Sequence, residues 1–536
     1  MYKFLFKKMF YLILIVMLSL VLVSCKDDDD EGDNKNDGLI VPELNVIEDN
    51  YRNWYEIFVY SFYDTNNDGI GDLNGVTEKL SYIKEMGFNG IWLMPIHPSP
   101  TYHKYDVNDY YAIDKAYGTL DDFKRLVEEA HKLDIKIIID LVVNHTSSDN
   151  PWFKGACEYI RQNGKPGGEY GEYYNFVTSN QGTGYSQVSG APYYYEARFW
   201  SGMPDLNLDS AKVKEEIKNI MKYWLIDYDV DGFRLDAVTS YYTGNVDKNV
   251  EFLSWLNTEA KKIKSNSYIV GEAWVGSDYE INRYYQSGVD SFFLFTGAQA
   301  TGSIASLVKL QSGQTLGKLF TTLQSTYTKG ILAPFLGNHD TMRPGSFMPG
   351  VENVKMSAGV LSMMNGGTFV YYGEEIGMIS KNGTSSDPHK RIAMKWKEKT
   401  IYPGVCYTTP EGISIDETYY YYPSVEEQMA DENSILNYYK AAMRLRNAFP
   451  SIARGTVENH SDGQSSYICV ITKTYLDEKI TIVFNLDSFE QNVTIDYAAL
   501  GCSEIVGELY VDNSTKATYD GTGNLTMPPQ SIVILK

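Results

Sequence analysis

Eight apolar runs recur along the chain, and segments with helical patterns separate them. Strands that alternate with helices indicate a parallel sheet, and eight such units indicate a closed (β/α)8 TIM barrel. The expected strands are residues 54–62, 90–96, 135–143, 232–238, 268–274, 289–295, 331–338 and 368–375. This repeated unit constrains the fold more than any other feature of the sequence.

The segment 119–133 shows the pattern of the helices between the strands. Thr119 is a candidate N-cap. One stripe of the helix would carry four apolar residues: Phe123, Leu126, Val127 and Ala130. Residues 249–264 show the same spacing, so we expect a second helix there.

Two parts of the chain depart from the alternation of strands and helices. Residues 146–200 are rich in Gly, Tyr, Asn and Ser and lack helical periodicity, which predicts a small domain B inserted after strand 3. The catalytic barrel would then comprise residues 51–145 and 201–448. After a helix at 434–449, short strand-like runs predict a C-terminal antiparallel β-sandwich over 449–536.

The N-terminus has the pattern of a targeting segment. A basic stretch precedes an apolar run from Met9 to Val23, which predicts a signal peptide over 1–24. The run ends in LVSC, which resembles a bacterial lipobox with Cys25 as the lipidated residue. A single transmembrane anchor is the alternative, but the run is short for a membrane span.

The acidic stretch that follows, within residues 25–50, predicts a disordered tether. We therefore expect an extracytoplasmic protein, lipid-anchored to a bacterial membrane. An acidic run directly after a lipidated cysteine also resembles the surface-export signal of some Gram-negative lipoproteins, which favours exposure at the cell surface.

Charge and cysteine content narrow the class of partner. The formal net charge is −22, which argues against a nucleic-acid partner because phosphate binding needs clustered Lys and Arg. Cys157, Cys406, Cys469 and Cys502 form no CxxC pair, so a zinc site is not expected. Cys469 and Cys502 fall in one predicted domain and could pair. We expect a monomer.

Polar residues follow the predicted strands where each one ends. In such barrels, catalytic residues lie at the C-terminal ends of strands. The residues that fall there are Asp140 and His145 after strand 3, Arg234 and Asp236 on strand 4, Glu272 after strand 5, and His339 and Asp340 after strand 7. We expect this set to converge on one face of the barrel.

Glycoside hydrolysis needs a paired acid and nucleophile, and this set can supply both. Asp236, held ionised by Arg234, suits the nucleophile. Glu272 lies beside Ala273 and Trp274, surroundings that keep a carboxyl protonated as an acid. Asp340 suits a third role, holding the substrate and the oxocarbenium-like transition state. A metal hydrolase is the weaker alternative, because no HxxxH or HxH spacing appears.

Four of these segments resemble the signature regions of the α-amylase family of glycoside hydrolases, family 13: DLVVNH, GFRLDAV, GEAW and FLGNHD. The segment MPDLN (203–207) resembles a fifth region, in the form seen in a group intermediate between oligo-1,6-glucosidases and neopullulanases. The resemblance runs from about Tyr51 to the C-terminus, with the motifs in order.

The resemblance implies that Asp236 is the nucleophile, Glu272 the acid/base and Asp340 the transition-state stabiliser. It also implies that further residues contact the sugar at the cleavage site: Arg234, His145 and His339. Many α-amylases carry Lys-His shortly after the nucleophile, whereas Thr239-Ser240 follow Val238 here. The calcium ligand and the substrate contact that those two residues supply are therefore not expected.

The segment YHKYDVNDYY (102–111) resembles the family segment whose tyrosine stacks on the sugar. The resemblance assigns that role to Tyr105, with His103 nearby. The family usually has Gly where Lys104 stands, a departure that we expect to alter the rim of the site. The segment KRIAMKW resembles the one whose arginine pairs with the aspartate of YDV, which implies that Arg391 and Asp106 bound the non-reducing side.

The segment DTNNDGIGD offers oxygen ligands at the alternate spacing of an EF-hand-like loop. The candidate ligands are Asp64, Asn66, Asp68, the Ile70 carbonyl and Asp72. Gly75 replaces the usual Glu at position twelve, so this is no EF-hand, and an acidic turn is the alternative. Family members bind calcium in this loop, so the resemblance favours Ca²⁺.

We therefore expect a retaining, endo-acting α-amylase that hydrolyses α-1,4 bonds of starch and maltooligosaccharides. Its two key carboxyls should lie about 5–5.5 Å apart. Alternatives within the family are an oligo-1,6-glucosidase, a neopullulanase or a transglycosylase, because fold does not fix function. A non-catalytic glycan-binding lipoprotein is the alternative from another class.

Overall fold

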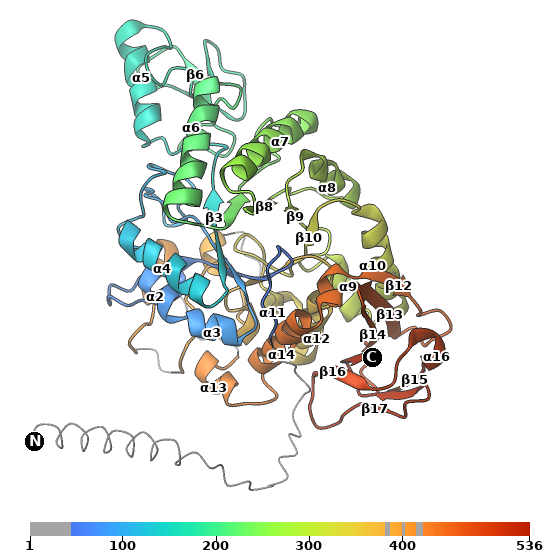
Figure 1. The fold of residues 1–536 in the computed structure, drawn as a ribbon. Helices are drawn as coiled ribbons and strands as arrows, with labels where there is room; N and C mark the ends of the chain where they lie inside the picture. The colour runs from blue at the N-terminus through green and yellow to red at the C-terminus, as the bar shows by residue number, and fades with distance from the viewer. Residues whose placement is uncertain (1–43, 381–385, 399–401, 414–421) are drawn as a thin grey trace, which may run out of the picture. The chain divides into compact units, whose positions relative to one another are not determined.

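The computed structural model describes residues 44–380, 386–398, 402–413 and 422–536 (Figure 1). An eight-stranded parallel sheet has the strand order β10-β9-β8-β7-β3-β2-β1-β11. Its strands are β1 (Asn53–Ile57), β2 (Gly90–Leu93), β3 (Lys136–Leu141), β7 (Gly232–Leu235), β8 (Tyr268–Gly271), β9 (Ser291–Phe293), β10 (Ile331–Ala333) and β11 (Thr368–Tyr371). A parallel bridge between Phe335 and Phe369 joins the two ends of the sheet. The predicted (β/α)8 barrel is confirmed.

Each strand is shorter than the apolar run that predicted it, and the difference falls mostly at the C-terminal end. β7 ends at Leu235, directly before Asp236, and β8 ends at Gly271, directly before Glu272. The acidic residues therefore stand in loops just beyond the parallel strands. This placement brings residues that are far apart in sequence to one end of the barrel.

The helices that accompany the barrel strands include α2 (Leu73–Glu78), α3 (Leu80–Glu85), α4 (Leu120–Lys132), α6 (Ala211–Lys222), α7 (Val246–Ile263), α8 (Asp278–Tyr284), α9 (Ser303–Lys309), α10 (Gly313–Thr326), α11 (Pro344–Phe347), α12 (Gly350–Ser362), α13 (Val425–Met429), α14 (Ile435–Ala448) and α15 (Pro450–Arg454). Thr119 caps α4 in a capping box with Asp122, and the four predicted apolar residues of α4 are buried. Helix α7 begins at Val246 rather than at residue 249, because Asn245 caps it.

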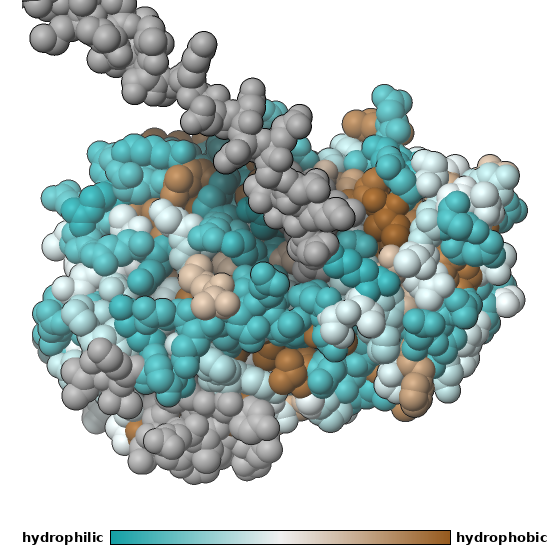
Figure 2. Space-filling view, turned by 90° about the horizontal axis from the view of Figure 1, so that it is seen from below, coloured by the Kyte–Doolittle hydropathy of each residue, from teal (hydrophilic) through white to brown (hydrophobic). Residues whose placement is uncertain are grey.

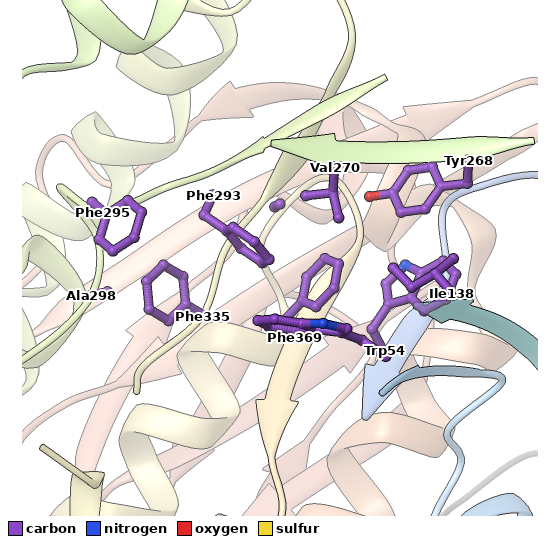
Figure 3. Close-up of a cluster of buried hydrophobic side chains, with 11 residues drawn as sticks. Trp54, Ile138, Tyr268, Val270, Phe293, Phe295, Ala298, Phe335 and Phe369 are labelled. Carbon is purple, nitrogen blue, oxygen red and sulfur yellow. The ribbon is translucent and has the colours of Figure 1, made fainter. Parts of the chain in front are cut away.

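Aromatic side chains fill much of the barrel interior (Figure 3). The indole of Trp54 on β1 stacks on Tyr268 of β8 and on Phe369 of β11, with ring centroids 4.9 and 5.8 Å apart. All three side chains are buried. Large rings from strands on different sides of the barrel thus contact one another, so burial of apolar area holds the strands in register.

The inserted segment is more regular than the sequence analysis expected. It contains a helix, α5 (Pro151–Asn163), and a three-stranded antiparallel sheet of β4 (Phe176–Val177), β6 (Tyr194–Glu196) and β5 (Tyr185–Gln187). The helix lies in a segment whose sequence shows no helical periodicity along its whole length. Asn150 caps its start, Pro151 occupies its first turn, and Gly164 ends it in a left-handed conformation.

The C-terminal region consists of two antiparallel sheets. The strands and helix are β12 (Thr456–Asn459), β13 (Ile468–Tyr475), β14 (Glu478–Asn485), β15 (Gln491–Thr494), α16 (Tyr497–Leu500), β16 (Ile505–Tyr510), β17 (Thr518–Tyr519), β18 (Asn524–Met527) and β19 (Ser531–Leu535). The possible pairing of Cys469 with Cys502 does not occur, because both are free thiols, as are Cys157 and Cys406. Cys502 instead donates to the Thr481 hydroxyl.

The predicted tether of residues 25–50 is wrong for its last residues. The Asn45 amide donates to the Asn447 carbonyl, Ile47 is buried, and Asp49 forms an ion pair with Arg454. These contacts fix residues 44–50 against the end of the barrel. The signal peptide, Cys25 and the rest of the tether lie outside the described residues.

The molecular surface is largely hydrophilic on the face shown in Figure 2, with apolar side chains in separate small patches. Within the described ranges, no helix combines the length and the apolar composition needed to cross a bilayer.

Candidate active site

A single guanidinium organises the polar cluster at the C-terminal ends of the strands. Arg234 is completely buried. Its Nη1 donates to Asp140 Oδ1 at 2.6 Å and to Asp236 Oδ1 at 2.7 Å, and its Nη2 lies 3.1 Å from Glu272 Oε1. The sequence analysis predicted the pairing with Asp236. The structure adds that three carboxyl groups share this one cation.

Three carboxyls around one cation cannot all ionise readily in a buried site. Burial raises the pKa of Glu272 to about 7, although Arg234 opposes the shift, and the charges of Asp236 and Asp340 add to it. Burial likewise raises the pKa of Asp140 to about 6 against the effect of Arg234. Glu272 is therefore the member of the cluster best suited to carry a proton near neutral pH.

The backbone next to Asp236 fixes the Glu272 carboxyl. Ala237 has a φ of +48°, a left-handed conformation that costs a non-glycine residue free energy. In this conformation its N–H donates to Glu272 Oε2 at 2.9 Å. One oxygen of Glu272 thus faces Arg234 and the other faces this N–H, so the carboxyl is held from both sides.

Asp340 occupies a different electrostatic environment from Glu272. Burial alone would raise its pKa, but His339 and Arg391 outweigh burial and lower the pKa of Asp340 far below its usual range. The Asp340 carboxylate lies 2.9 Å from His339 Nε2 and 2.6 Å from Arg391 Nη2. Asp340 is therefore ionised, as a group that stabilises positive charge on a substrate must be.

His339 connects Asp340 to the first strand of the barrel. Its Nδ1 lies 2.5 Å from Glu56 Oε1, and its Nε2 also lies 2.7 Å from the Tyr105 hydroxyl. Burial would lower the pKa of His339, but Asp340 and Glu56 raise it to about 9. The ring of Tyr105 stacks on the His339 ring with centroids 5.6 Å apart. His339 is thus a charged support for Asp340 and Tyr105.

The predicted catalytic and sugar-contacting residues line a cavity of about 350 Å³. Those in its wall are Asp236, Glu272, Asp340, His103, Tyr105, His145 and Arg391. Arg234 and His339 lie behind this wall and contact its carboxylates. The imidazole of His145 packs edge-on against Phe199, with ring centroids 5.2 Å apart.

Two predictions about the rim of this cavity are wrong. Arg391 does not pair with Asp106; it pairs with Asp340 and, at 3.4 Å, with Asp387. The carboxylate of Asp106 instead accepts hydrogen bonds from Ser99 and Thr101. Arg391 and Asp106 therefore do not bound the site as a pair.

Lys104 does not alter the rim, contrary to the second of these predictions. It adopts a φ of +62°, which explains why a glycine suits this position in related sequences. Its ammonium is buried, 2.7 Å from Asp114 and over the ring of Tyr117.

The sequence analysis missed several residues of the site. Phe199, Trp200 and Trp274 line the cavity, and about half of each residue is exposed. Phe199 and Trp200 lie at the end of a Tyr-rich loop that gave no signal to single them out, and Trp274 was considered only as a neighbour of Glu272. Glu56 has a recognisable signal in the sequence, because it is a charged residue inside an apolar strand, as Arg234 is.

The predicted metal loop has the donors that Ca²⁺ prefers. Asp64 and Asp72 are buried and form no ion pair with a described Lys, Arg or His. Both accept backbone N–H groups of their own loop. Hard oxygen donors with unbalanced negative charge fit a calcium ion chemically. In the part of the chain that the structure describes, however, no three His, Cys, Asp or Glu side chains already converge as a metal site.

A barrel whose strand ends place two aspartates and a glutamate with a raised pKa around one cavity has the architecture of a glycoside hydrolase. The catalytic-domain model of the alpha-amylase family matches residues 56–455. The chain therefore belongs to the α-amylase family of glycoside hydrolases, as its signature segments predicted.

Known relatives agree with this assignment. The chain is 36% identical over 505 residues to "Alpha-amylase 3" of Dictyoglomus thermophilum, covering 91% of this chain and 93% of that protein. It is 30% identical to an "Oligo-1,6-glucosidase" of Parageobacillus thermoglucosidasius, covering 80% and 89% of the two chains. Among solved structures, "Eubacterium rectale Amy13B" superposes with a TM-score of 0.86 at 41% identity, covering 92% and 97%.

The raised pKa of His339 predicts a pH dependence of stability. The folded pKa of about 9 exceeds the unfolded value of about 6.5. The contribution of the charged His339 to the free energy of unfolding is thus fully present below about pH 6.5 and is lost as the pH rises through about 9. His339→Gln should remove this loss, which amounts to about 3 kcal/mol at most.

The measurement is the free energy of unfolding by denaturant at several pH values across this window. His460→Gln, at a surface histidine, is the matched control and should keep the wild-type slope. Equal slopes in His339→Gln and the wild type would contradict the assignment of a charged His339.

Proposed function

We propose that the protein is a retaining, endo-acting α-amylase that hydrolyses α-1,4-glucosidic bonds of starch and maltooligosaccharides. The observation that carries this proposal is the contact of Arg234 with both Asp236 and Glu272 at the wall of one cavity. The two carboxyls share a cation and face the same substrate space, as an acid and a nucleophile of one reaction must.

In the proposed mechanism, Asp236 attacks the anomeric carbon while Glu272 donates its proton to the departing glycosidic oxygen. The C–O bond to the leaving chain breaks, and a covalent glycosyl–Asp236 ester forms. Glu272, now ionised, takes a proton from water, whose oxygen attacks the same carbon and releases Asp236. The ionised Asp340 would stabilise the positive charge that develops on the sugar in both steps.

A second cavity supports action within a chain rather than at its end. It measures about 360 Å³, and Trp274 lines both it and the catalytic cavity. Trp274 stands two residues after the acid Glu272 and stacks on Phe295 with ring centroids 4.8 Å apart. Space on this side of the acid gives room for several sugars of the leaving chain, which an endo-acting enzyme needs.

Cleavage of α-1,6 bonds is the second candidate, because several relatives are named oligo-1,6-glucosidases. Initial rates on amylose, pullulan, isomaltose and cyclodextrin separate the candidates. The proposal expects amylose to be cleaved fastest. A protein that binds maltoheptaose without releasing reducing sugar would instead be a glycan-binding lipoprotein.

The anomer released from maltoheptaose tests the mechanism. A retaining enzyme releases the α-anomer first, which NMR detects before mutarotation. Glu272→Gln removes the acid and should lower kcat by a factor of about 10² or more. Glu280→Gln, at an exposed position on α8, is the matched control and should keep wild-type activity. A β-anomer at first turnover would rule out this mechanism.

We further propose that the loop carrying Asp64, Asn66, Asp68, Ile70 and Asp72 holds Ca²⁺, and that Cys25 carries the lipid anchor, as their sequence patterns predict. The calcium would join the loop after β1 to the start of α2, where Asp72 is the N-cap. Bound metal would act on stability, since a ligand that binds only the folded state stabilises it.

Removing calcium should therefore lower the thermal unfolding temperature. Calorimetry with and without a calcium chelator measures the shift, and calcium added back should reverse it. Asp64→Asn should lose the response, whereas Asp227→Asn, which is exposed and outside the loop, should retain it. A wild-type Tm that does not respond to the chelator would leave the acidic turn as the explanation of this segment.

A further inference from the structure

A cavity larger than the catalytic one lies at the opposite end of the barrel. Its volume is about 530 Å³. Tyr51 stands just before β1, Gly330 just before β10 and Gly366 just before β11, and all three line this cavity. These are the N-terminal ends of the strands, whereas the catalytic residues follow the C-terminal ends. The remaining wall comes from α10 and the junction of α15 with β12.

Specific contacts build this wall and hold the cavity open. Gly330 has a φ of +69°, and a Cβ there would come 2.4 Å from the Tyr285 ring. The Gln324 amide joins α10 to β12, accepting from Val457 N at 2.6 Å and donating to the Val457 carbonyl at 3.1 Å. The Asn365 amide donates to the Gly455 carbonyl at 2.8 Å. The cavity is therefore pre-formed, as binding sites usually are.

Two buried basic side chains fix the loop that forms one side of the cavity. Arg446 donates to the carbonyls of Met364 and Gly366, and Lys473 donates to the Met363 carbonyl at 2.7 Å. These hydrogen bonds are made within the protein, so both side chains support the wall of the cavity.

The charges at the cavity favour a neutral ligand. Among the described residues that line it, only Arg454 carries a charge. Its guanidinium is held by both oxygens of Asp49, at 2.7 and 2.5 Å, and lies over the Tyr51 ring at 5.0 Å. This bidentate pair balances the charge, so an anion or a cation would find no free counter-charge.

The other lining groups suit a ring that carries hydroxyls. Thr328 and Thr456 offer hydroxyls, and the side-chain amides of Gln324 and Asn365 each keep one N–H that the wall contacts do not use. Tyr51 and other residues offer apolar surface. Alternating apolar and hydrogen-bonding surface matches a sugar ring, which has both apolar faces and polar edges.

We propose that this cavity is a second carbohydrate-binding site, separate from the catalytic cavity, which takes the glucose units of an α-glucan. The identity of the sugar rests on the proposed function, whereas the preference for a neutral polyhydroxylated ligand rests on the cavity itself. A site about one barrel length from the catalytic residues would hold a long polymer near the enzyme. It would matter little for short oligosaccharides.

The test counts binding sites for maltoheptaose by isothermal titration calorimetry on the full chain carrying Glu272→Gln, which prevents turnover. Thr328→Trp, at an exposed position in the cavity wall, should fill the cavity and lower the count by one. Thr322→Trp, at an exposed position of the same region outside the lining, is the matched control and should leave the count unchanged.

The second measurement is enzymatic activity, with each Trp substitution made in the chain that retains Glu272. Thr328→Trp should leave kcat/KM for maltotriose unchanged and lower the rate on starch granules several-fold relative to Thr322→Trp. Thr456→Trp, at an exposed position elsewhere in the same wall, should behave like Thr328→Trp, which excludes misfolding of one variant as the cause.

A site count that is the same in Thr328→Trp, Thr456→Trp and Thr322→Trp would overturn the second site. If the wild-type chain cleaves maltoheptaose in that case, the proposed function stands and only this inference fails. If the wild-type chain cleaves no α-glucan, the proposed function fails, and the site count in the Glu272→Gln chain still decides whether the cavity binds carbohydrate.

Discussion

The contact of one buried guanidinium with three carboxyl groups is the interaction on which the active site depends. Replacing buried ion pairs with apolar residues often costs a protein no stability, so packing alone does not explain Arg234 on an otherwise apolar strand. Its contacts with Asp140, Asp236 and Glu272 leave one cation among three acids. Burial raises the pKa of Glu272 to about 7 against the effect of Arg234, and the charges of Asp236 and Asp340 add to the shift. Burial and charge distribution together thereby assign chemical roles to similar side chains.

The barrel supplies the geometry that this charge distribution requires. Asp140 lies near the C-terminal end of β3, and Asp236 and Glu272 directly follow the neighbouring strands β7 and β8. Parallel strands end at the same face, so the residues at these strand ends meet there. The aromatic interior around Trp54 keeps the strands in place, and the strained backbone of Ala237 aims an N–H at the acid.

The sequence predicted the barrel strands and the polar residues at their ends because both have local signals. Apolar runs mark strands, and a charge such as Arg234 inside such a run stands out. The helix α5 was missed although its cap residues Asn150 and Gly164 are visible in the sequence. The pairing of Arg391 was also wrong, because the partner depends on how two loops meet. Asp387, four residues earlier on the same turn, lies within reach, whereas Asp106 bonds to its own loop.

The contacts that support the site were the least predictable part. Glu56 acts through His339, 283 residues away in sequence, and no local pattern connects the two. No local pattern predicts the cavity at the N-terminal ends of the strands either, because its walls come from four separate parts of the chain. Such features follow from the closure of the barrel and from its junction with the C-terminal sheets, which only the three-dimensional arrangement defines.

The pH dependence of kcat/KM for maltoheptaose tests most directly whether Arg234 and its three acids leave Glu272 protonated. Measured from about pH 5 to about pH 9, kcat/KM should fall on the alkaline side with an apparent pKa of about 7, because the acid must hold its proton to act. A kcat/KM that stays constant up to about pH 9 would contradict this account of the active site.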